Sequence, residues 1–128
     1  MKIGEVASRT GLSAHTLRYY EKIGLIPVAP KDQAGQRAYD AAIFPWIEFL
    51  GRLKQTGMPI QGMLRYATLR AAGPVTELQR RDLLIAHRER VRAQIAQLQA
   101  CVCVLDDKIV GYANTIMERT GHDTGSTL

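Results

Sequence analysis

Side chains able to contact phosphates or base edges gather in the segment SAHTLRYYEKIG, residues 13–24. Ser13 suits the N-cap of a helix, and Gly24 suits the left-handed residue that ends one. The helix between them carries six hydrogen-bonding or cationic side chains, namely His15, Thr16, Arg18, Tyr19, Tyr20 and Lys22. Arginine, threonine and tyrosine on one short helix favour binding in a DNA groove. The alternative is an ordinary surface helix with a partly buried tyrosine pair.

The segment before this helix strengthens the DNA-binding interpretation. Residues 2–9 place Ile3, Val6 and Ala7 at helical spacing, and residues 10–12 form a turn around a glycine. A short helix, a tight turn and a second, polar helix make a helix-turn-helix, whose second helix enters the major groove. We therefore predict that residues 13–24 contain a recognition helix.

A small hairpin is predicted after the recognition helix, over residues 25–39. Two prolines and a glycine exclude a helix here, whereas residues 26–29 and 36–39 suit short strands joined by a loop over residues 31–35. Three side chains of this wing are candidates for DNA contact, namely Lys31 in the loop and Arg37 and Tyr39 on the return strand. A cationic wing tracks phosphates or enters the minor groove. The alternative is a solvated loop with ordinary charges.

Two further helices complete an N-terminal domain that we predict to span residues 1–73. They cover residues 41–56, after Asp40, and residues 60–72, after Pro59. Pro45 predicts a local kink or a late start of the first of these helices, because proline lacks the amide hydrogen of the helical ladder. Trp46 belongs to the apolar stripe of the same helix and is predicted to fill the core beneath the wing.

One long amphipathic helix is predicted over residues 75–118. Its apolar seam advances mostly by alternating steps of four and three, through Leu84, Val91, Ile95, Leu98, Val102, Leu105, Ile109, Tyr112 and Ile116. A helix of roughly 65 Å needs a partner along its length, and the simplest partner is a second copy of the chain. We therefore predict a dimerisation domain over residues 74–118 and a flexible tail over residues 119–128. His87, also on the seam, is expected to be packed or hydrogen-bonded rather than a ligand.

The composition limits the class of protein. The chain has 128 residues, a net charge of +5, 46% hydrophobic and 23% charged residues, so it is globular and suited to a polyanionic partner. No apolar run approaches the roughly 18 residues that a membrane-spanning helix needs, and the N-terminus lacks the apolar core of a signal peptide. We expect a cytoplasmic location and no membrane partner.

Together these segments resemble the MerR family of bacterial transcription regulators. The resemblance rests on IGEVA at residues 3–7, TLRYYEKIGLI at residues 16–26, the wing pattern Gly35-x-Arg37-x-Tyr39, FLGRLKQTGM at residues 49–58, and the long final helix. It covers nearly the whole chain. The chain is similar to the small members of the family, which lack a separate effector domain.

The resemblance implies a mostly α fold, with a winged helix-turn-helix followed by an antiparallel coiled coil. It also implies binding to an inverted-repeat operator in a promoter, and distortion of that DNA in response to an effector so that RNA polymerase can use it. Two heads on a rigid rod would contact half-sites at fixed spacing, and a change in DNA shape would act as the switch. Carried over by position, the recognition helix contributes Thr16, Arg18, Tyr19 and Tyr20, and the wing contributes Arg37 and Tyr39.

The signal that such a regulator would sense is left open by the sequence. The long-helix pattern resembles members linked to aldehyde or electrophile stress, but Arg52 stands where their thiol sensors have cysteine. No cofactor or metal site is expected, because Cys101 and Cys103 would lie about 200° apart around a helix. Cys101, near the middle of the seam, is a candidate redox contact across a dimer. The simpler interpretation makes both cysteines packing residues.

Two other classes of protein remain alternatives. A DNA-architectural protein of the excisionase kind shares the winged helix-turn-helix, but many such proteins stop soon after the wing. A coiled-coil adaptor would use the basic head as a protein-binding surface, and its binding would lack the steep salt dependence of DNA binding. An enzyme is not expected, because the sequence shows no nucleophile motif, phosphate-binding loop or catalytic cluster.

Overall fold

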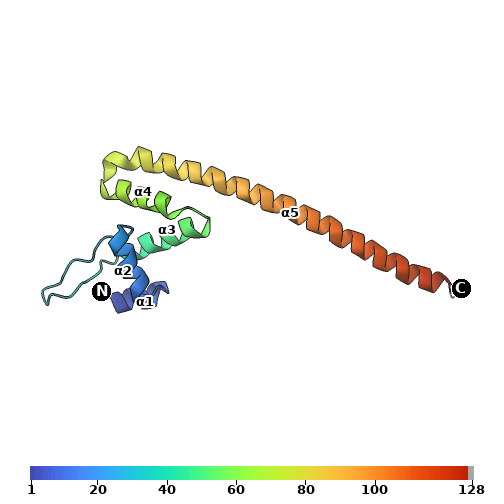
Figure 1. Ribbon diagram of the computed structural model, residues 1–128, viewed down its shortest axis with the longest axis horizontal. Helices are drawn as coiled ribbons and strands as arrows, with labels where there is room; N and C mark the ends of the chain where they lie inside the picture. Colours follow the sequence, from blue (N-terminus) through green and yellow to red (C-terminus); the bar gives the residue numbers. More distant parts are fainter. Residues whose placement is uncertain (127–128) are drawn as a thin grey trace. The chain divides into compact units, whose positions relative to one another are not determined.

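The computed structural model describes residues 1–126, and the side chains up to position 121. Within this range the chain is mostly helical (Figure 1), with α1 (Ile3–Thr10), α2 (Ala14–Ile23), α3 (Ile43–Gln55), α4 (Ile60–Ala71), a short 3-10 helix (Pro74–Thr76) and α5 (Glu77–Ser126). It divides into two compact units, residues 1–88 and residues 89–128, and α5 belongs to both.

The predicted helix-turn-helix is present because its caps are satisfied locally. The Ser13 hydroxyl oxygen accepts the Thr16 amide at 3.0 Å, which fixes the start of α2. Gly24 ends α2 in the left-handed conformation with φ 84°. The side chains of Val6 on α1 and Leu17 on α2 are fully buried, so the two helices pack against each other in the core of the first unit.

The helix α3 begins late, as Pro45 predicted. The Asp40 carboxylate accepts the Ala42 amide at 2.9 Å in a turn, and the helix starts only at Ile43, two residues after the expected position. Pro45 then occupies the first helical turn, where its missing amide hydrogen costs little. Trp46 follows directly and points into the core.

Trp46 connects α3 to Leu25, at the start of the wing, and to α4. It is only 5% exposed, and its indole N–H donates to the Leu25 carbonyl at 3.0 Å. Its ring stacks on Tyr66 of α4 with centroids 5.8 Å apart, and the Arg70 guanidinium lies 4.2 Å from its centroid. Trp46 is therefore the core residue beneath the wing that the sequence predicted.

The wing is a hairpin without the two predicted strands. Among the described residues its only β-pairing is the antiparallel bridge between Lys31 and Arg37. Pro27 and Pro30 have no amide hydrogen to donate, so a longer ladder cannot form on the first arm. The turn is instead held by the Asp32 carboxylate, which accepts the amides of Ala34 and Gln36 at 2.9 Å each.

The start of α5 belongs to the core of the first unit. Leu83 and Leu84 pack against that core, and His87 is 7% exposed with Nε2 2.7 Å from the Thr56 hydroxyl. His87 is thus packed and hydrogen-bonded, as expected. Leu84, in contrast, was predicted to contact a second copy. The structure places it against the core of the chain's own first unit, residues 1–88, which we also call the head.

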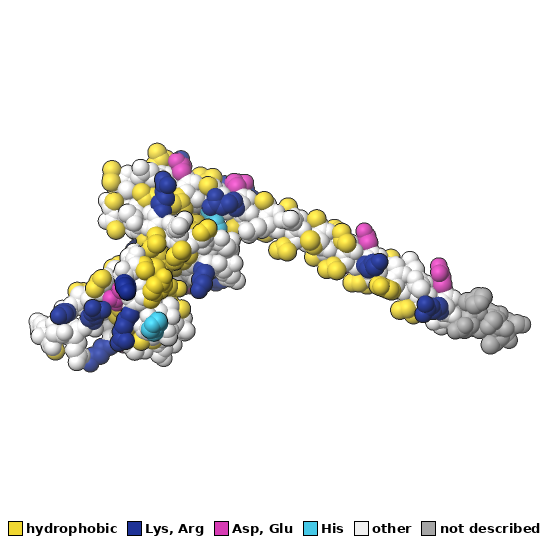
Figure 2. All heavy atoms as spheres, in the orientation of Figure 1, with side chains coloured by type: hydrophobic (Ala, Val, Ile, Leu, Met, Phe, Trp, Pro, Cys, Tyr) yellow, Lys and Arg dark blue, Asp and Glu magenta, His cyan; other side chains and the backbone are white. Residues whose placement is uncertain are grey.

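The second unit contains the rest of α5, which was expected to end at Glu118 and instead continues as helix to Ser126. The last two residues of the expected flexible tail, Thr127 and Leu128, lie outside the described residues. Yellow apolar side chains run along this part of α5 in Figure 2. The exposed ones that belong to the predicted seam are Ile95, Leu98, Val102, Leu105, Ile109, Tyr112 and Ile116.

Candidate nucleic-acid interface

Four of the six predicted side chains on α2 form one outer face, which we call the recognition face: His15, Arg18, Tyr19 and Lys22. They follow the spacing i, i+3, i+4, i+7, which places residues on one side of a helix. All four are exposed, and Tyr19 keeps 50% of its surface accessible. The face combines two fixed cations with an imidazole and a phenol, so it can donate several hydrogen bonds to a polyanion.

The other two predicted contacts on α2 are placed differently. The Thr16 side chain is half-buried, and its hydroxyl oxygen accepts a hydrogen bond from Ser13 at 2.9 Å as part of the helix cap. Tyr20 is half-buried against the core, on the side of α2 that faces α3. Tyr20 was predicted to contact DNA, but its side chain turns toward the core, because position i+1 from Tyr19 lies on another side of the helix.

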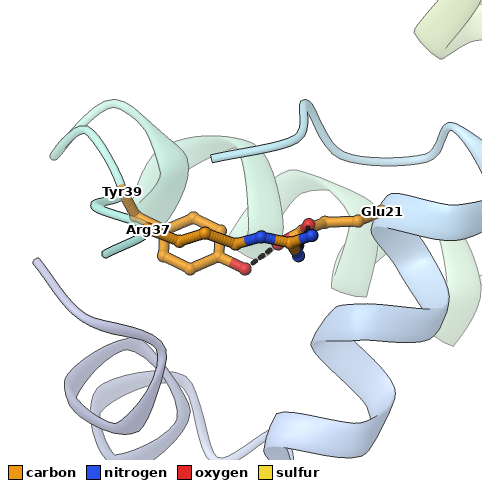
Figure 3. A network of polar contacts seen from close by, with 3 residues as sticks. All are labelled: Glu21, Arg37 and Tyr39. Carbon is orange, nitrogen blue, oxygen red and sulfur yellow. Dashed lines mark hydrogen bonds and ion pairs between the residues drawn. The ribbon is translucent and has the colours of Figure 1, made fainter. Parts of the chain in front are cut away.

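A buried carboxylate connects the recognition helix to the wing (Figure 3). The Glu21 side chain is 4% exposed, and it accepts a hydrogen bond from the Tyr39 hydroxyl and an ion pair from Arg37 at 3.0 Å. In Figure 3 both wing side chains, Arg37 and Tyr39, point toward Glu21. Arg37 and Tyr39 follow Glu21 by 16 and 18 positions in the sequence, so these contacts fix the wing against α2.

This network changes the roles of two predicted wing residues. Tyr39 was predicted to contact DNA, but it is 5% exposed and its hydroxyl donates to Glu21 inside the protein. One guanidinium nitrogen of Arg37 forms the ion pair with Glu21, but 53% of the Arg37 side chain is exposed. Its other N–H groups are therefore free to reach a phosphate. Sequence reasoning missed Glu21, although its position four residues after the buried Leu17 marks the inner face of α2.

A basic groove lies between the recognition helix, the wing and the N-terminus. It measures about 440 Å³ and is lined by Lys2, Ile3, Arg18, Gln36 and Arg37. Lys2 is held there because the backbone of Met1 pairs with that of Tyr39, with hydrogen bonds of 2.9 and 2.6 Å. Three cations and no carboxylate line the groove, so it suits a phosphate backbone.

Sequence reasoning did not include Lys2 or Gln36 among the contacts. A lysine before the first helix gave no periodic signal, and only the pairing of the N-terminus with the wing shows that Lys2 lies beside Arg37. Lys31, which was predicted, is exposed at the bridge that begins the wing loop. Dark blue side chains gather around this end of the head in Figure 2.

Other kinds of site are not evident in the part of the chain that the structure describes. No group of three or more histidine, cysteine or acidic side chains is placed to hold a metal ion within it. Its helices include none with the length and apolar content to cross a membrane. Cys101 and Cys103 are both free thiols on the exposed surface of α5.

Comparison with known proteins decides the family. Residues 2–39, which hold the helix-turn-helix and the wing, match the model of the MerR family regulatory proteins. The HTH-type transcriptional regulator AdhR of Bacillus subtilis is 40% identical over 91 residues, which is 71% of this chain and 65% of AdhR. An uncharacterised HTH-type transcriptional regulator of Haemophilus influenzae is 33% identical over 108 residues, 84% of this chain and 80% of the relative. The chain belongs to the MerR family.

The fold agrees with this membership. The crystal structure of HiNmlR, a MerR family regulator lacking the sensor domain and bound to promoter DNA, superposes with a TM-score of 0.76 at 32% identity. The superposition covers 88% of this chain and 90% of HiNmlR. As a MerR family protein, the chain is a DNA-binding transcription regulator with a mostly helical fold.

Proposed function

We propose that this chain is a dimeric, sequence-specific regulator that binds an inverted-repeat operator in promoter DNA. The observation that carries the proposal is the convergence of the recognition face and the basic groove on one side of α2. Arg18 belongs to both, with Lys22 further along the helix and Lys2 and Arg37 across the groove. The HiNmlR complex with promoter DNA supports the same mode of binding for this MerR family head.

In this proposal the two parts of the surface do different work. The recognition face enters the major groove, where Arg18 reaches a base edge or a phosphate and Tyr19 contacts the backbone. The basic groove holds the neighbouring phosphates, because Lys2 and Arg37 neutralise charge and release counterions. Glu21 touches no DNA and acts as a positioning residue, since it holds Arg37 at a fixed place beside α2.

The second copy is proposed to pack on the exposed seam of α5. The eight seam positions from Val91 to Ile116 pair with one another in an antiparallel arrangement: Val91 beside Ile116, Ile95 beside Tyr112, Leu98 beside Ile109, and Val102 beside Leu105. Leu84 and His87 fall outside this set, which agrees with their use in the core of the first unit. The seam is therefore self-complementary without them, as a two-fold symmetric interface requires.

A dimer of this kind would act on promoter shape. Two heads would bind half-sites at fixed spacing, and bending or untwisting of the DNA between them would change how RNA polymerase uses the promoter. We propose a cytoplasmic regulator with no enzymatic activity, which responds to a stress signal or a small effector. The thiol sensor of related regulators is replaced by Arg52, so another part of this chain would receive the signal.

The proposal is tested by binding to DNA from the region upstream of the chain's own gene and its neighbours. Fluorescence anisotropy is measured over a salt series, with a scrambled duplex of equal length as control. We expect tight binding to one inverted repeat, with an affinity that falls steeply as salt rises. Equal affinity for both duplexes would favour an architectural protein instead. Binding to neither duplex, with and without candidate effectors, would contradict the proposal.

A further inference from the structure

A second groove opens on the head, between the helix-turn-helix and α3. It has a volume of about 420 Å³, within the range of small-molecule sites. Its walls come from the end of α1, the turn at Leu12, Tyr20 of α2, one side of α3 and Met63 of α4. It lies entirely within the first unit and shares no residue with the basic groove.

The floor of this second groove, which we call the effector groove after the role inferred below, is apolar. Ile47, Leu50 and Met63 are buried at its base, and the half-buried rings of Tyr20 and Phe44 form its sides. Gly51 on α3 leaves an opening, because a Cβ at that position would meet no atom within 4 Å. The floor can therefore take a flat or linear hydrocarbon body against the helix backbone.

Two cations stand at the rim without a carboxylate partner among the described side chains. The Arg9 guanidinium lies 4.2 Å from the centroid of the Phe44 ring, and one of its N–H groups donates a hydrogen bond to the Met1 sulfur at 3.4 Å. Lys54 is exposed on α3, and no ion pair is formed by either residue within the described range. Glu48 is the single acidic residue in the lining, so the rim carries a net positive charge.

We infer that the effector groove binds a small apolar carboxylate, with its hydrocarbon body on the floor and its anionic group between Arg9 and Lys54. Charge-assisted hydrogen bonds from these donors select the anion, and the apolar floor selects against hydrophilic acids. Glu48 opposes the binding of dianions, since a second negative charge would lie near its carboxylate. The site needs no cysteine and no metal.

A ligand here would touch the DNA-binding element from behind. Thr10 is the last residue of α1, Leu12 lies in the turn between α1 and α2, and Tyr20 lies on the inner side of the recognition helix. A ligand that bridges these residues to α3 stabilises one position of α2 relative to another. The DNA affinity then changes according to the difference between the ligand's affinities for the two positions of α2. This regulatory step rests on the proposed function, whereas the binding step does not.

The binding step is tested by NMR of the full chain labelled with ¹³C at its methionine methyl groups. Benzoate and octanoate are titrated as probes, and benzamide is the uncharged control. We expect a saturable shift of the Met63 signal, assigned with Met63→Leu, and no shift of Met117, which lies on α5. A Met63 signal that does not move, or that moves equally with benzamide, overturns the inference.

Charge and volume variants make the test specific. Arg9→Gln and Lys54→Gln should each weaken benzoate binding about tenfold, and Glu48→Gln should tighten it several-fold. Gly51→Leu should abolish binding by filling the opening while α3 stays folded, because nothing lies within 4 Å of the added Cβ. Gly111→Leu on α5 is the matched control and should bind benzoate normally. A normal titration in Gly51→Leu would overturn the assignment of the site.

The regulatory step is measured separately, as the affinity for the operator with and without saturating benzoate. A change of at least several-fold that disappears in Gly51→Leu supports an effector site. An unchanged affinity would overturn the coupling while the Met63 titration still stands. If the second copy instead fills the groove, benzoate will not bind and Gly51→Leu will weaken the dimer, which overturns the inference. Failure of DNA binding itself leaves the benzoate titration as an independent result.

Discussion

At the scale of single residues, Glu21 has an unusual position for an acidic side chain on a DNA-binding helix. An isolated buried carboxylate is costly, so it needs donors that replace its lost hydration. Tyr39 supplies one from the core and Arg37 supplies another from the surface. The same contacts place Arg37 beside the recognition face, so one acidic residue both completes the core and orients the cation that we propose to contact a phosphate.

Replacing Tyr39 with phenylalanine tests the energetic part of this account. Tyr39→Phe removes a donor from a buried carboxylate and should lower the free energy of unfolding by about 1–3 kcal/mol. Urea denaturation followed by circular dichroism measures the change. Tyr19→Phe is the matched control, since Tyr19 is half exposed and should change stability by less than about 0.5 kcal/mol. Equal effects of the two substitutions would contradict the network's role.

Arg18 is the residue whose loss should affect DNA binding most directly. Arg18→Ala should cost about 1–3 kcal/mol of specific binding and relax the preference at one base pair if the guanidinium contacts a base. An even loss across all sequences would instead indicate a phosphate contact. Arg65→Ala, at an exposed site on α4, removes the same charge and should leave specificity unchanged. Anisotropy titrations with a set of single-base operator variants distinguish these outcomes.

At the scale of elements, the ends of the helices are set by short-range interactions. Ser13 caps α2 with its own hydroxyl, and Gly24 ends it where φ is 84°. After Gly24, the amides of Leu25 and Ile26 return to the Tyr20 carbonyl at 2.9 and 3.3 Å, which closes the helix and directs the chain toward the wing. The geometry of the wing therefore depends on the left-handed conformation of Gly24.

Two glycine-to-alanine substitutions should have opposite effects on stability, because one glycine has a left-handed backbone and the other lies inside a helix. Gly24→Ala forces a side chain into the left-handed region and should destabilise the protein by about 1–2 kcal/mol. Gly51→Ala, inside α3 with no atom within 4 Å of the new Cβ, should instead stabilise it by about 0.5–1 kcal/mol. Denaturation midpoints of the two variants should move in opposite directions. A shift in the same direction would contradict the assigned conformations.

Local features were predictable from the sequence, and long-range ones were not. The caps of α2, the late start of α3 at Pro45 and the position of Trp46 in the core all follow from short-range rules. Tyr20 and Tyr39 were assigned to DNA because a tyrosine in a basic segment can face either way. Their inward placement depends on α3 and on Glu21, which are distant in sequence.

The same limit applies to the wing and to α5. Two short segments on either side of a loop suggested two strands, but Pro27 and Pro30 remove the donors that a ladder needs, and a single bridge remains. Leu84 shares the periodicity of the seam, yet it packs against the head. Periodicity shows which side of a helix is apolar, but it does not show which partner covers each part of that side.

At the scale of the whole molecule, the exposed seam of α5 is the surface on which the proposed second copy would pack. Leucine, isoleucine and valine side chains along one stripe of the helix remain 51–66% exposed, from Ile95 at 51% to Leu98 at 66%, which is unusual for a monomer. The proposed antiparallel dimer would cover this stripe through pairs such as Leu98 with Ile109. A change on this stripe should therefore affect assembly, whereas a change next to it should not.

Neighbouring positions on α5 provide a matched test of this interface. Leu105→Glu puts a charge on the seam and should shift the protein from dimer to monomer in sedimentation velocity, because a buried unpaired carboxylate is costly. Val104→Glu introduces the same charge one residue away, at a side chain that is 67% exposed against 60% for Leu105, and should leave the dimer intact. Dissociation by both substitutions, or by neither, would contradict the proposed seam.

The prolines of the wing have a further consequence for behaviour at high concentration. Val28 is a β-branched residue that is 61% exposed, and it lies between Pro27 and Pro30 in a segment without regular secondary structure. Such a segment would ordinarily offer a template for strand addition and aggregation between molecules. Neither proline can donate a backbone hydrogen bond, and Lys31 follows with a charge, so the arm is protected from edge-to-edge association. The residues that keep the wing from forming a regular strand thus also favour its solubility.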